Sequence, residues 1–252
     1  ITEIASNGLD PGAHIVYQGN RNFVPETSLQ EDLGLLFSYP SIDGSLSVFN
    51  NNLSHYIFLK QAPTVIVPGN KTYRYVQSGA WLYGLEAAAG LHPAAWKGWR
   101  WDNSLALTYG FNREPAYRHA GLQGAYLPFI PPLQWNSGVG KDWALRRRWL
   151  PTVSAGVETD YVAAQHRFLA LDQTETATRS YTLVELHVGG SIRYAGENLL
   201  QWQFQVNNLL DAAYQSNLSR LKYFEYYAAS PNGRTGIYSM GRNFGLKVIM
   251  AF

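Results

Sequence analysis

Several long polar segments of the chain carry side chains that could bind a small anionic or aromatic ligand. Arg and His offer positive charge and hydrogen bonds, and Tyr offers a ring face and a hydroxyl, so these residue types suit such a ligand. The candidates are Tyr117, Arg118, His119, His166, Arg167, Tyr223, Tyr226 and Tyr227. The competing interpretation is a set of solvated loops of ordinary composition, with the tyrosines used for packing, and the sequence leaves both open.

A second group of charged residues raises the question of a metal. Glu185 and His187 are two residues apart and could share a metal ion, but an ion pair or a contact with another part of the protein explains them, together with Arg193, more simply. Catalysis would need a His beside an acid or a Ser at one site, and no motif arranges His119 or His166 in that way. We therefore expect no catalytic residue, no cofactor and no metal site.

The composition excludes several classes of protein. The 252 residues include no Cys, so a disulfide framework and a cysteine metal site are impossible, and a net charge of +2 gives no sign of nucleic-acid binding. Charged residues make up only 15%, where about 25% is ordinary for a soluble domain, and aromatic residues reach 14%. No stretch reaches the roughly 18 apolar residues of a membrane helix. A large soluble β-protein and a transmembrane β-barrel remain.

Apolar and polar residues alternate along most of the chain, as they do in β-strands whose two faces meet different surroundings. The clearest case is the segment 200–207, in which apolar residues at even positions are separated by amides. This alternation predicts about nine strands, at 28–39, 44–58, 73–92, 99–112, 133–143, 150–164, 181–194, 200–207 and 241–252. We therefore expect an all-β antiparallel meander in which each strand pairs with its neighbour in sequence.

The two predicted faces favour a transmembrane barrel over a soluble sandwich. The polar face carries Gln, Asn, Ser, Thr and Gly rather than Lys and Glu, and aromatic residues gather toward strand ends. We expect an apolar set to face lipid and a polar set to face the lumen. The apolar set is Trp202, Phe204, Val206, Leu246, Val248 and Met250, and the polar set is Gln203, Gln205 and Lys247.

The connections between the predicted strands alternate in length. Short ones lie near 40–44, 93–97, 144–148 and 195–198, and long ones near 59–72, 113–132, 165–180 and 215–240. Outer-membrane barrels have short periplasmic turns and long extracellular loops, so we expect the short connections at one end of the sheet and the long ones at the other.

Two segments near the end of the chain carry a recognisable family pattern. The segment 202–214, with Asn208, Leu209, Asp211 and Tyr214, resembles the "NLFD-x-x-Y" penultimate strand of TonB-dependent outer-membrane receptors. The ending, with Gly241, Arg242, Asn243 and Phe252, resembles their final "GRNF" strand with a terminal Phe. Weaker resemblances lie at 25–28, 83–86 and 126–132, in the order in which the family has them.

The resemblance implies a fold and a function. It implies that residues 1–252 are one domain, the C-terminal part of a 22-stranded transmembrane barrel whose plug and N-terminal barrel half are absent from this sequence. The implied location is the bacterial outer membrane, and the implied function is TonB-dependent import of a scarce ligand, expected to be a ferric siderophore. The implied partners are outer-membrane lipid, the missing plug and barrel half in the same or another chain, TonB through that plug, and a siderophore-like ligand, but no nucleic acid.

Two other functions are compatible with the sequence. One is a small stand-alone porin-like or structural barrel of the outer membrane, and the other is a soluble two-sheet carbohydrate-binding module. The chain begins at Ile1 without Met and shows no signal peptide, so we expect that such a segment was removed or that the chain is a fragment. For a fragment we expect an open sheet with the first and last strands as edges, rather than a closed small barrel.

Overall fold

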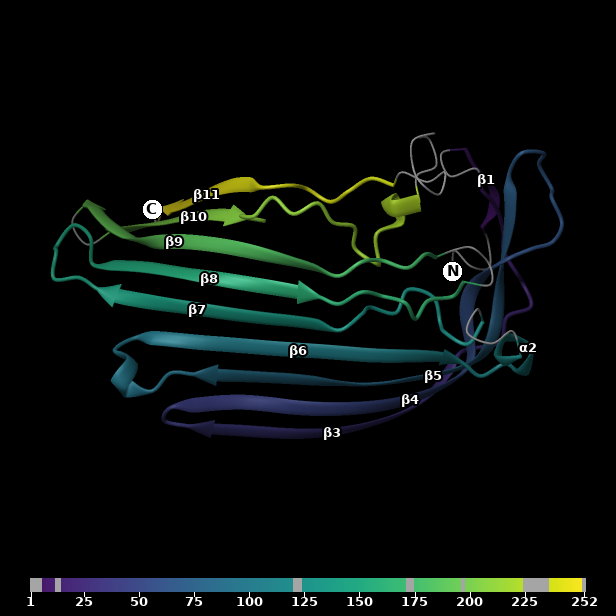
Figure 1. The fold of residues 1–252 in the computed structure, drawn as a ribbon, viewed down its shortest axis with the longest axis horizontal. Helices are drawn as coiled ribbons and strands as arrows, with labels where there is room; N and C mark the ends of the chain where they lie inside the picture. The colour runs from purple at the N-terminus through teal and green to yellow at the C-terminus, as the bar shows by residue number, and fades with distance from the viewer. Residues whose placement is uncertain are drawn as a thin grey trace.

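The structure is a computed structural model that describes residues 6–11, 15–119, 124–170, 175–195, 198–223 and 236–250. Long strands dominate it and lie side by side in one layer (Figure 1). The strands are β1 (Asn7–Asp10), β2 (Ile15–Gln18), β3 (Thr27–Tyr39), β4 (Ile42–Gln61), β5 (Lys71–Leu91), β6 (Trp99–Asn112), β7 (Gln134–Ala144), β8 (Thr152–Val162), β9 (Tyr181–Ala195), β10 (Asn198–Asn207) and β11 (Asn243–Met250). Three short helical segments lie in the connections: η1 (Ala94–Trp96), α2 (Pro115–Arg118) and η3 (Arg220–Tyr223).

Strands β3 to β11 form an antiparallel meander in which each strand pairs with its neighbours in sequence. The predicted fold class and meander are confirmed, and the observed strand bounds differ from the predicted ones by a few residues. Within the described part of the chain, β3 and β11 are not paired with each other, so the sheet is open. Both of these edge strands run in the same direction, because each begins at the end of the sheet where the long connections lie.

The short strands β1 and β2 were not predicted from the sequence. They form a hairpin, and β2 runs parallel to the first residues of β5, Lys71–Arg74. This edge of β5 is available because its pairing with β6 begins only at Ala80, opposite Asn112. Strands of four residues show too few alternations to stand out in a sequence, and the segment of β5 that pairs with β2 lies more than fifty residues away.

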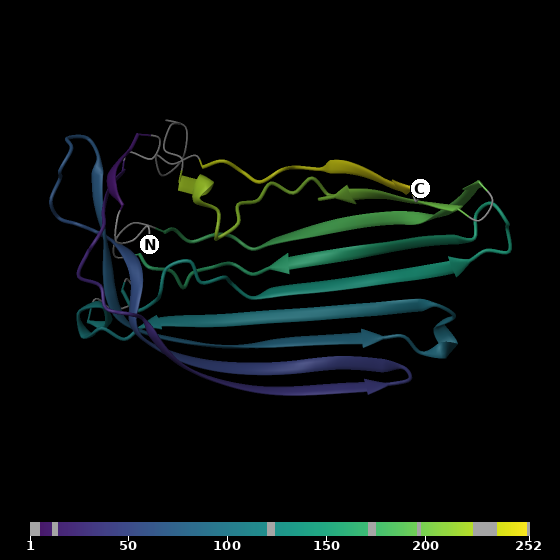
Figure 2. The same cartoon turned by 180° about the vertical axis from the view of Figure 1, so that it is seen from behind.

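The connections are sorted by length between the two ends of the sheet, as predicted. The connections from β3 to β4, β5 to β6, β7 to β8 and β9 to β10 lie at one end, which we call the tight-turn end (Figures 1 and 2). The opposite end, which we call the long-loop end, carries the long connections together with α2 and η3. In outer-membrane barrels the tight-turn end faces the periplasm and the long-loop end faces the cell exterior.

The register of the strands separates an apolar face from a polar face. Across β10 and β11, Trp202 is opposite Val248 and Phe204 is opposite Leu246, whereas Gln203 is opposite Lys247. Opposite residues share a face, so the predicted apolar and polar sets lie on two different sides of the sheet. The same apolar face continues through the pairs Trp135 with Tyr161, Trp101 with Val139, and Trp81 with Phe111.

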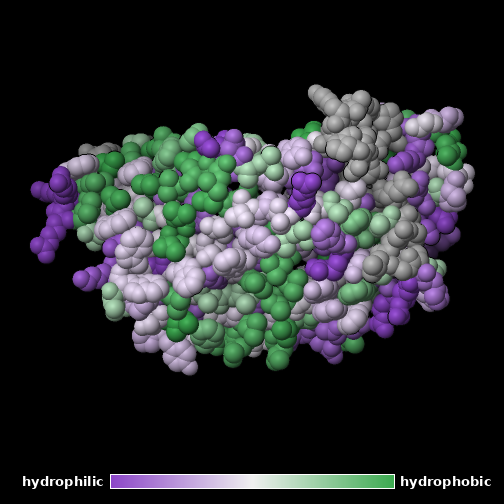
Figure 3. All heavy atoms as spheres, in the orientation of Figure 1, coloured by the Kyte–Doolittle hydropathy of each residue, from purple (hydrophilic) through white to green (hydrophobic). Residues whose placement is uncertain are grey.

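Large apolar side chains on the apolar face are exposed over most strands. Leu33 is 73% exposed and Leu246 is 71% exposed, and Trp, Tyr, Phe and Val side chains on the strands between them are also exposed. Figure 3 shows apolar groups over the middle of the strands and hydrophilic residues at both ends. Soluble monomers rarely expose an apolar surface of this extent, whereas a lipid-facing barrel wall requires one. The helices within the described residues are too short to cross a membrane.

Aromatic residues form two belts on the apolar face. Trp99 and Trp101 lie near the tight-turn end of β6, and Tyr109 and Phe111 lie near its long-loop end. Trp101 and Phe111 are ten residues apart, which corresponds to about 33 Å along a strand and about 25 Å across a membrane at the usual tilt. That height matches the apolar band of an outer-membrane barrel, so the two belts mark the membrane borders.

Candidate functional site at the long-loop end

The connections at the long-loop end pack into an ordered cap on the polar face of β4 and β5. One apolar cluster joins Phe58 of β4 to Tyr117 of α2 and Leu169 of the connection between β8 and β9. A second cluster joins Ala80 of β5 to Leu127 and Ile130 of the connection between β6 and β7. Because both clusters contain residues from long connections, these loops are anchored on the sheet.

Three connections that are distant in the sequence meet at the backbone carbonyl of Ile130. The side-chain amide of Gln165, which is fully buried, donates a hydrogen bond to this oxygen at 2.7 Å. The side-chain amide of Asn217 donates to the same oxygen at 3.0 Å. Buried amides of this kind fix loop positions, because breaking either bond would leave polar groups unsatisfied away from water.

Glu175 is a buried carboxylate that holds two of these connections together. It is 2% exposed, and its oxygens accept hydrogen bonds from the backbone N–H of Phe129 at 2.7 Å and of Leu169 at 3.1 Å. Burial raises the pKa of Glu175 above its usual range, and the two backbone hydrogen bonds and the charge of Lys222 oppose this rise.

Lys222, in η3, brings the last long connection to the same place. Its ammonium donates to Oδ1 of Asn217 at 3.3 Å and to the carbonyl of Thr176 at 3.5 Å. Burial lowers the pKa of Lys222 to about 8, and the charge of Glu175 partly offsets this effect. Together, the four residues Gln165, Glu175, Asn217 and Lys222 form a polar network, which we call the cap network.

The structure separates the neighbouring candidates Tyr117, Arg118 and His119. The ring of Tyr117 is buried, lies 5.5 Å from the ring of Phe58, and has the ammonium of Lys60 over its face at 4.7 Å. Arg118 instead lines a hollow on the apolar side of the sheet, and His119 is exposed at the end of α2. Tyr117 therefore packs the cap, and a role of these three residues in ligand binding stays a prediction.

The remaining candidates lie in two other connections. His166 is exposed, and the guanidinium of Arg167 lies 4.3 Å from the ring centre of Tyr109. Tyr109 belongs to the aromatic belt near the long-loop end, which we call the upper aromatic belt. Tyr223 is the last residue of η3, whereas Tyr226 and Tyr227 lie outside the described residues. Among the described residues, no hydrogen bond, ion pair or ring contact joins His119, His166 and Arg167 to one another. The structure thus places the described candidates at one end of the sheet, and His119, His166 and Arg167 share no such contact there.

The family-pattern residues form a clamp where β10 ends and β11 begins. Asn208 is buried, and its side chain bonds both the N–H and the carbonyl of Ala212, at 2.8 and 2.9 Å. The carboxylate of Asp211 accepts the backbone N–H of Arg242 at 2.8 Å, and the guanidinium of Arg242 donates to the carbonyl of Leu209 at 2.8 Å. These contacts tie the two strand ends together across the long connection.

The other residues of the pattern support the same clamp. A Cβ atom at Gly241 would lie 2.7 Å from Oδ1 of Asp211, so a larger residue there would displace this carboxylate from the clamp. Asn243 accepts a hydrogen bond from the side chain of Asn207 at 2.8 Å, and the ring of Tyr214 lies 4.5 Å from that of Tyr181. Phe252 lies outside the described residues.

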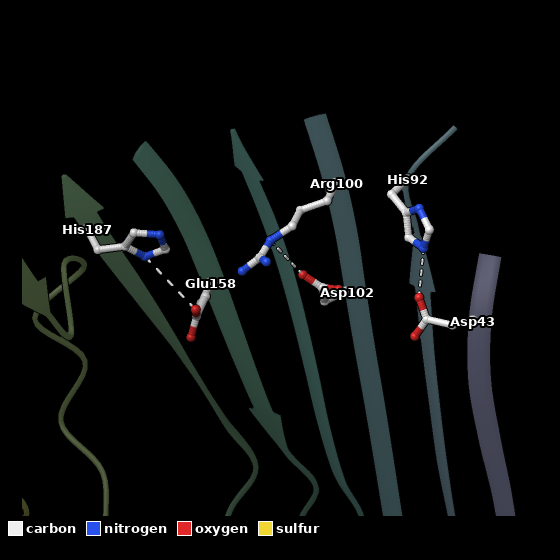
Figure 4. Close-up of polar contacts among 6 residues, drawn as sticks. All are labelled: Asp43, His92, Arg100, Asp102, Glu158 and His187. Carbon is white, nitrogen blue, oxygen red and sulfur yellow. Dashed lines mark hydrogen bonds and ion pairs between the residues drawn. The ribbon is translucent and has the colours of Figure 1, made fainter. Parts of the chain in front are cut away.

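Ionisable residues of the polar face form three pairs, of which two join neighbouring strands or their ends and one lies within β6 (Figure 4). The pairs are Asp43 with His92 at 2.8 Å, Asp102 with Arg100 at 3.2 Å, and Glu158 with His187 at 3.9 Å. Glu185 is directly opposite Glu158 in the register of β8 and β9. Within the described residues, no group of three or more His, Cys, Asp or Glu side chains is arranged to hold a metal ion. The ionisable partner that the structure gives His187 is therefore Glu158, on the neighbouring strand.

The cap network was not among the candidates from the sequence. Its members are single polar residues in two different connections, and Asn217 is 87 residues from the carbonyl that it contacts. No spacing or motif marks such residues, because their burial depends on how the loops fold over the sheet. The signal in the sequence is limited to the length of the connections.

A sequence model of one known family matches most of the chain. The family is described as TonB dependent receptor-like, beta-barrel, and the match covers residues 1–209. No curated protein is significantly similar to the chain by sequence alone.

Several solved structures share the fold. The copper transporter OprC has 21% sequence identity and a TM-score of 0.71, over 90% of this chain and 32% of its own. The ferric yersiniabactin uptake receptor FyuA from Yersinia pestis has 18% identity and a TM-score of 0.60, over 91% and 31%. BauA, the ferric preacinetobactin receptor from Acinetobacter baumannii, has 16% identity and a TM-score of 0.61, over 90% and 30%. The chain therefore spans about a third of the length of these structures.

Proposed function

The chain belongs to the TonB-dependent receptor-like β-barrel family, and on that basis we propose that it forms part of the wall and the outer loops of a receptor that imports a scarce ligand. Its location is the bacterial outer membrane, where proteins of this family reside. The exposed apolar face between two aromatic belts supports this location, because such a surface is stable only against lipid.

The ligand we propose is a ferric siderophore. FyuA and BauA are named as receptors for ferric yersiniabactin and ferric preacinetobactin, whereas OprC is named as a copper transporter, so copper is the competing ligand. The observation that carries the proposal is the ordered cap at the long-loop end, which presents His119 and His166 to solvent. Exposed imidazoles can donate hydrogen bonds and carry positive charge, which suits an anionic metal complex, and the packed cap gives them a fixed support.

The proposed division of labour follows from the two faces of the sheet. The loops would bind the ligand at the cell exterior, and the polar face would line the path through the lumen. The energy would reach the receptor through TonB and the plug, which lie outside this chain. A stand-alone porin-like barrel is less well supported, because within the described residues the edge strands β3 and β11 are not paired with each other and the sheet does not close.

Uptake by the complete receptor tests this proposal. The full-length gene product would be produced in a strain without other ferric siderophore receptors, with and without functional TonB, and supplied with radiolabelled ferric siderophores or radiolabelled copper. We expect TonB-dependent uptake of a ferric siderophore. Uptake of copper alone would overturn the choice of ligand, and the absence of TonB-dependent uptake of either would overturn the transport function.

A pair of loop variants locates the binding site. We expect the double variant His119→Ala and His166→Ala to raise the half-saturating siderophore concentration while leaving the amount of receptor in the membrane unchanged. Arg179→Ala is the matched control, because Arg179 is exposed at the same end but is not a candidate. Equal half-saturation in the double variant and the wild type would place the site elsewhere.

A further inference from the structure

The apolar face carries a hollow just beyond the upper aromatic belt, toward the long-loop end. The hollow has a volume of about 460 Å³ and lies between β4, β5, the end of β6 and α2. On β4 the apolar positions change from Leu46 and Val48 to Asn50 and Asn52, both of which line the hollow. The change from aliphatic to amide side chains shows where the lipid-facing surface of this strand becomes polar.

Two arginines lie at this hollow. The guanidinium of Arg113 donates to Oδ1 of Asn52 at 2.8 Å, which fixes its position beside the hollow. The side chain of Arg118 is exposed and, within the described residues, forms no hydrogen bond or ion pair. Arginine is the side chain best suited to phosphate, because its planar guanidinium can donate two parallel hydrogen bonds.

The floor of the hollow is aromatic. Trp81 and Phe111 line it with ring centres 5.9 Å apart, and the indole N–H of Trp81 donates to Oδ1 of Asn50 at 2.7 Å. The rings of Tyr83 and Tyr109 continue this surface toward the membrane centre, at 4.7 Å from Trp81 and 5.2 Å from each other. A ligand with a polar head and apolar chains therefore finds cations at one end and rings at the other.

The depth of the hollow agrees with a lipid headgroup. Arg113 follows Phe111 by two residues, so its Cα lies about 7 Å farther along the strand than the upper aromatic belt. Aromatic belts mark the border between the hydrocarbon region and the headgroups. The two arginines consequently lie at the level of the headgroups of the outer leaflet.

We propose that this hollow binds the phosphate of an anionic lipid of the outer leaflet. Arg113 and Arg118 contact the phosphate, and the aromatic rings that begin at Trp81 and Phe111 lie along the acyl chains. This site is separate from ligand import, because it lies on the lipid-facing side of the wall. Two carboxylates are close to the arginines: Glu31, which accepts a hydrogen bond from the side chain of Asn50 at 2.9 Å, and the exposed Glu114, which follows Arg113 in the chain.

Lipid binding to the complete receptor in non-ionic detergent tests the proposal, with diphosphoryl lipid A as the probe and native mass spectrometry as the readout. We expect Arg118→Ala to weaken binding about tenfold, because one charge-assisted hydrogen bond is lost. Arg118→Lys should keep part of the affinity, Glu31→Gln should increase it, and Arg179→Ala should leave it unchanged. Arg118→Ala breaks no internal contact of the described residues, so its folding should be normal by heat-modifiable gel migration.

Three results would overturn the proposal. The first is equal affinity of wild type and Arg118→Ala for lipid A. The second is equal binding of lipid A from which both phosphates have been removed, which would show that only the acyl chains are recognised. The third is full displacement of lipid A by millimolar inorganic phosphate, which would show a simple anion site. A receptor that imports no ligand would still be expected to bind lipid A here, so failure of the import proposal is a separate result.

Discussion

Asn208 makes three side-chain hydrogen bonds at the end of β10 although it is almost fully buried. Its partners are the N–H and carbonyl of Ala212 and, at 3.4 Å, the carbonyl of Met240. Its backbone also adopts a left-handed conformation, with φ of 50°. Asn tolerates this conformation better than other residues with a Cβ, so the position requires both the amide and the backbone of Asn.

Replacing Asn208 should destabilise the clamp between β10 and β11. We expect Asn208→Ala to lower the free energy of unfolding by about 1–3 kcal/mol, because buried partners lose their hydrogen bonds. Asn208→Gly keeps the backbone conformation and should lose less. Urea unfolding of the complete receptor in detergent measures both. Equal stability of Asn208→Ala and the wild type would show that the clamp does not stabilise the sheet.

The low pKa of Lys222 predicts how the cap responds to pH. The pKa of Lys222 is about 8 in the packed cap and about 10.4 in solvent, so the packed state releases this proton more readily. The contribution of Lys222 to cap stability should therefore improve as the pH rises from about 8 toward about 10. In Lys222→Met this change should disappear. In Glu175→Gln it should begin at lower pH, because the neighbouring negative charge no longer holds the proton.

A spin label attached at Ala177→Cys, an exposed position two residues from Glu175, would report on the cap. The chain itself contains no Cys, so it offers no competing thiol. We expect the mobility of the label to decrease from about pH 8 to about pH 10 in the labelled protein that keeps Lys222, because its cap becomes more stable over this range. A mobility that is independent of pH, or the same response in Lys222→Met, would contradict the assigned role of Lys222.

At the scale of elements, close contact between strands depends on small residues at particular places. Gly84 of β5 lies under the ring of Phe49, and a Cβ atom there would be 2.7 Å from that ring and in collision with the carbonyl of Leu107. Gly34 of β3 is different, since a Cβ atom there would meet nothing closer than the carbonyl of Leu46 at 4.0 Å.

These two glycines make a matched test. We expect Gly84→Ala to lower the midpoint of thermal unfolding, because β6 or the Phe49 ring must move, and Gly34→Ala to leave it nearly unchanged. Loss of heat-modifiable gel migration with temperature is a suitable measurement for a barrel in detergent. If both variants melted at the wild-type temperature, the packing of β4, β5 and β6 would be looser than described.

The long strands could be predicted from the sequence because each has one face toward lipid and one toward a polar interior. The alternation of apolar and amide side chains in Leu200–Asn207 is a direct trace of these two faces in the order of amino acids. The cap could not be predicted, because Gln165 and Asn217 look like ordinary loop residues until both meet the carbonyl of Ile130. For the same reason Tyr117 and Arg118, adjacent in sequence, could not be assigned to opposite sides of the sheet.

At the scale of the whole molecule, the open sheet predicts dependence on further strands. The edge strands β3 and β11 would expose backbone N–H and C=O groups to lipid, where each unsatisfied group costs several kcal/mol. We expect the chain produced alone to give no protease-resistant barrel in outer membranes, and co-production with the rest of the receptor barrel to restore resistance. Resistance of the chain alone would favour the stand-alone barrel instead.

The common direction of β3 and β11 restricts what can complete the wall. Both strands run from the long-loop end to the tight-turn end, so joining them directly would create a parallel pair in an otherwise antiparallel sheet. Neighbours in a closed antiparallel cylinder must alternate up and down, which makes closure a question of parity. The meander β3 to β11 contributes nine strands, so only an odd number of additional strands can close it, and the total is then even. A complement with an even number of strands would leave a parallel pair where the cylinder closes.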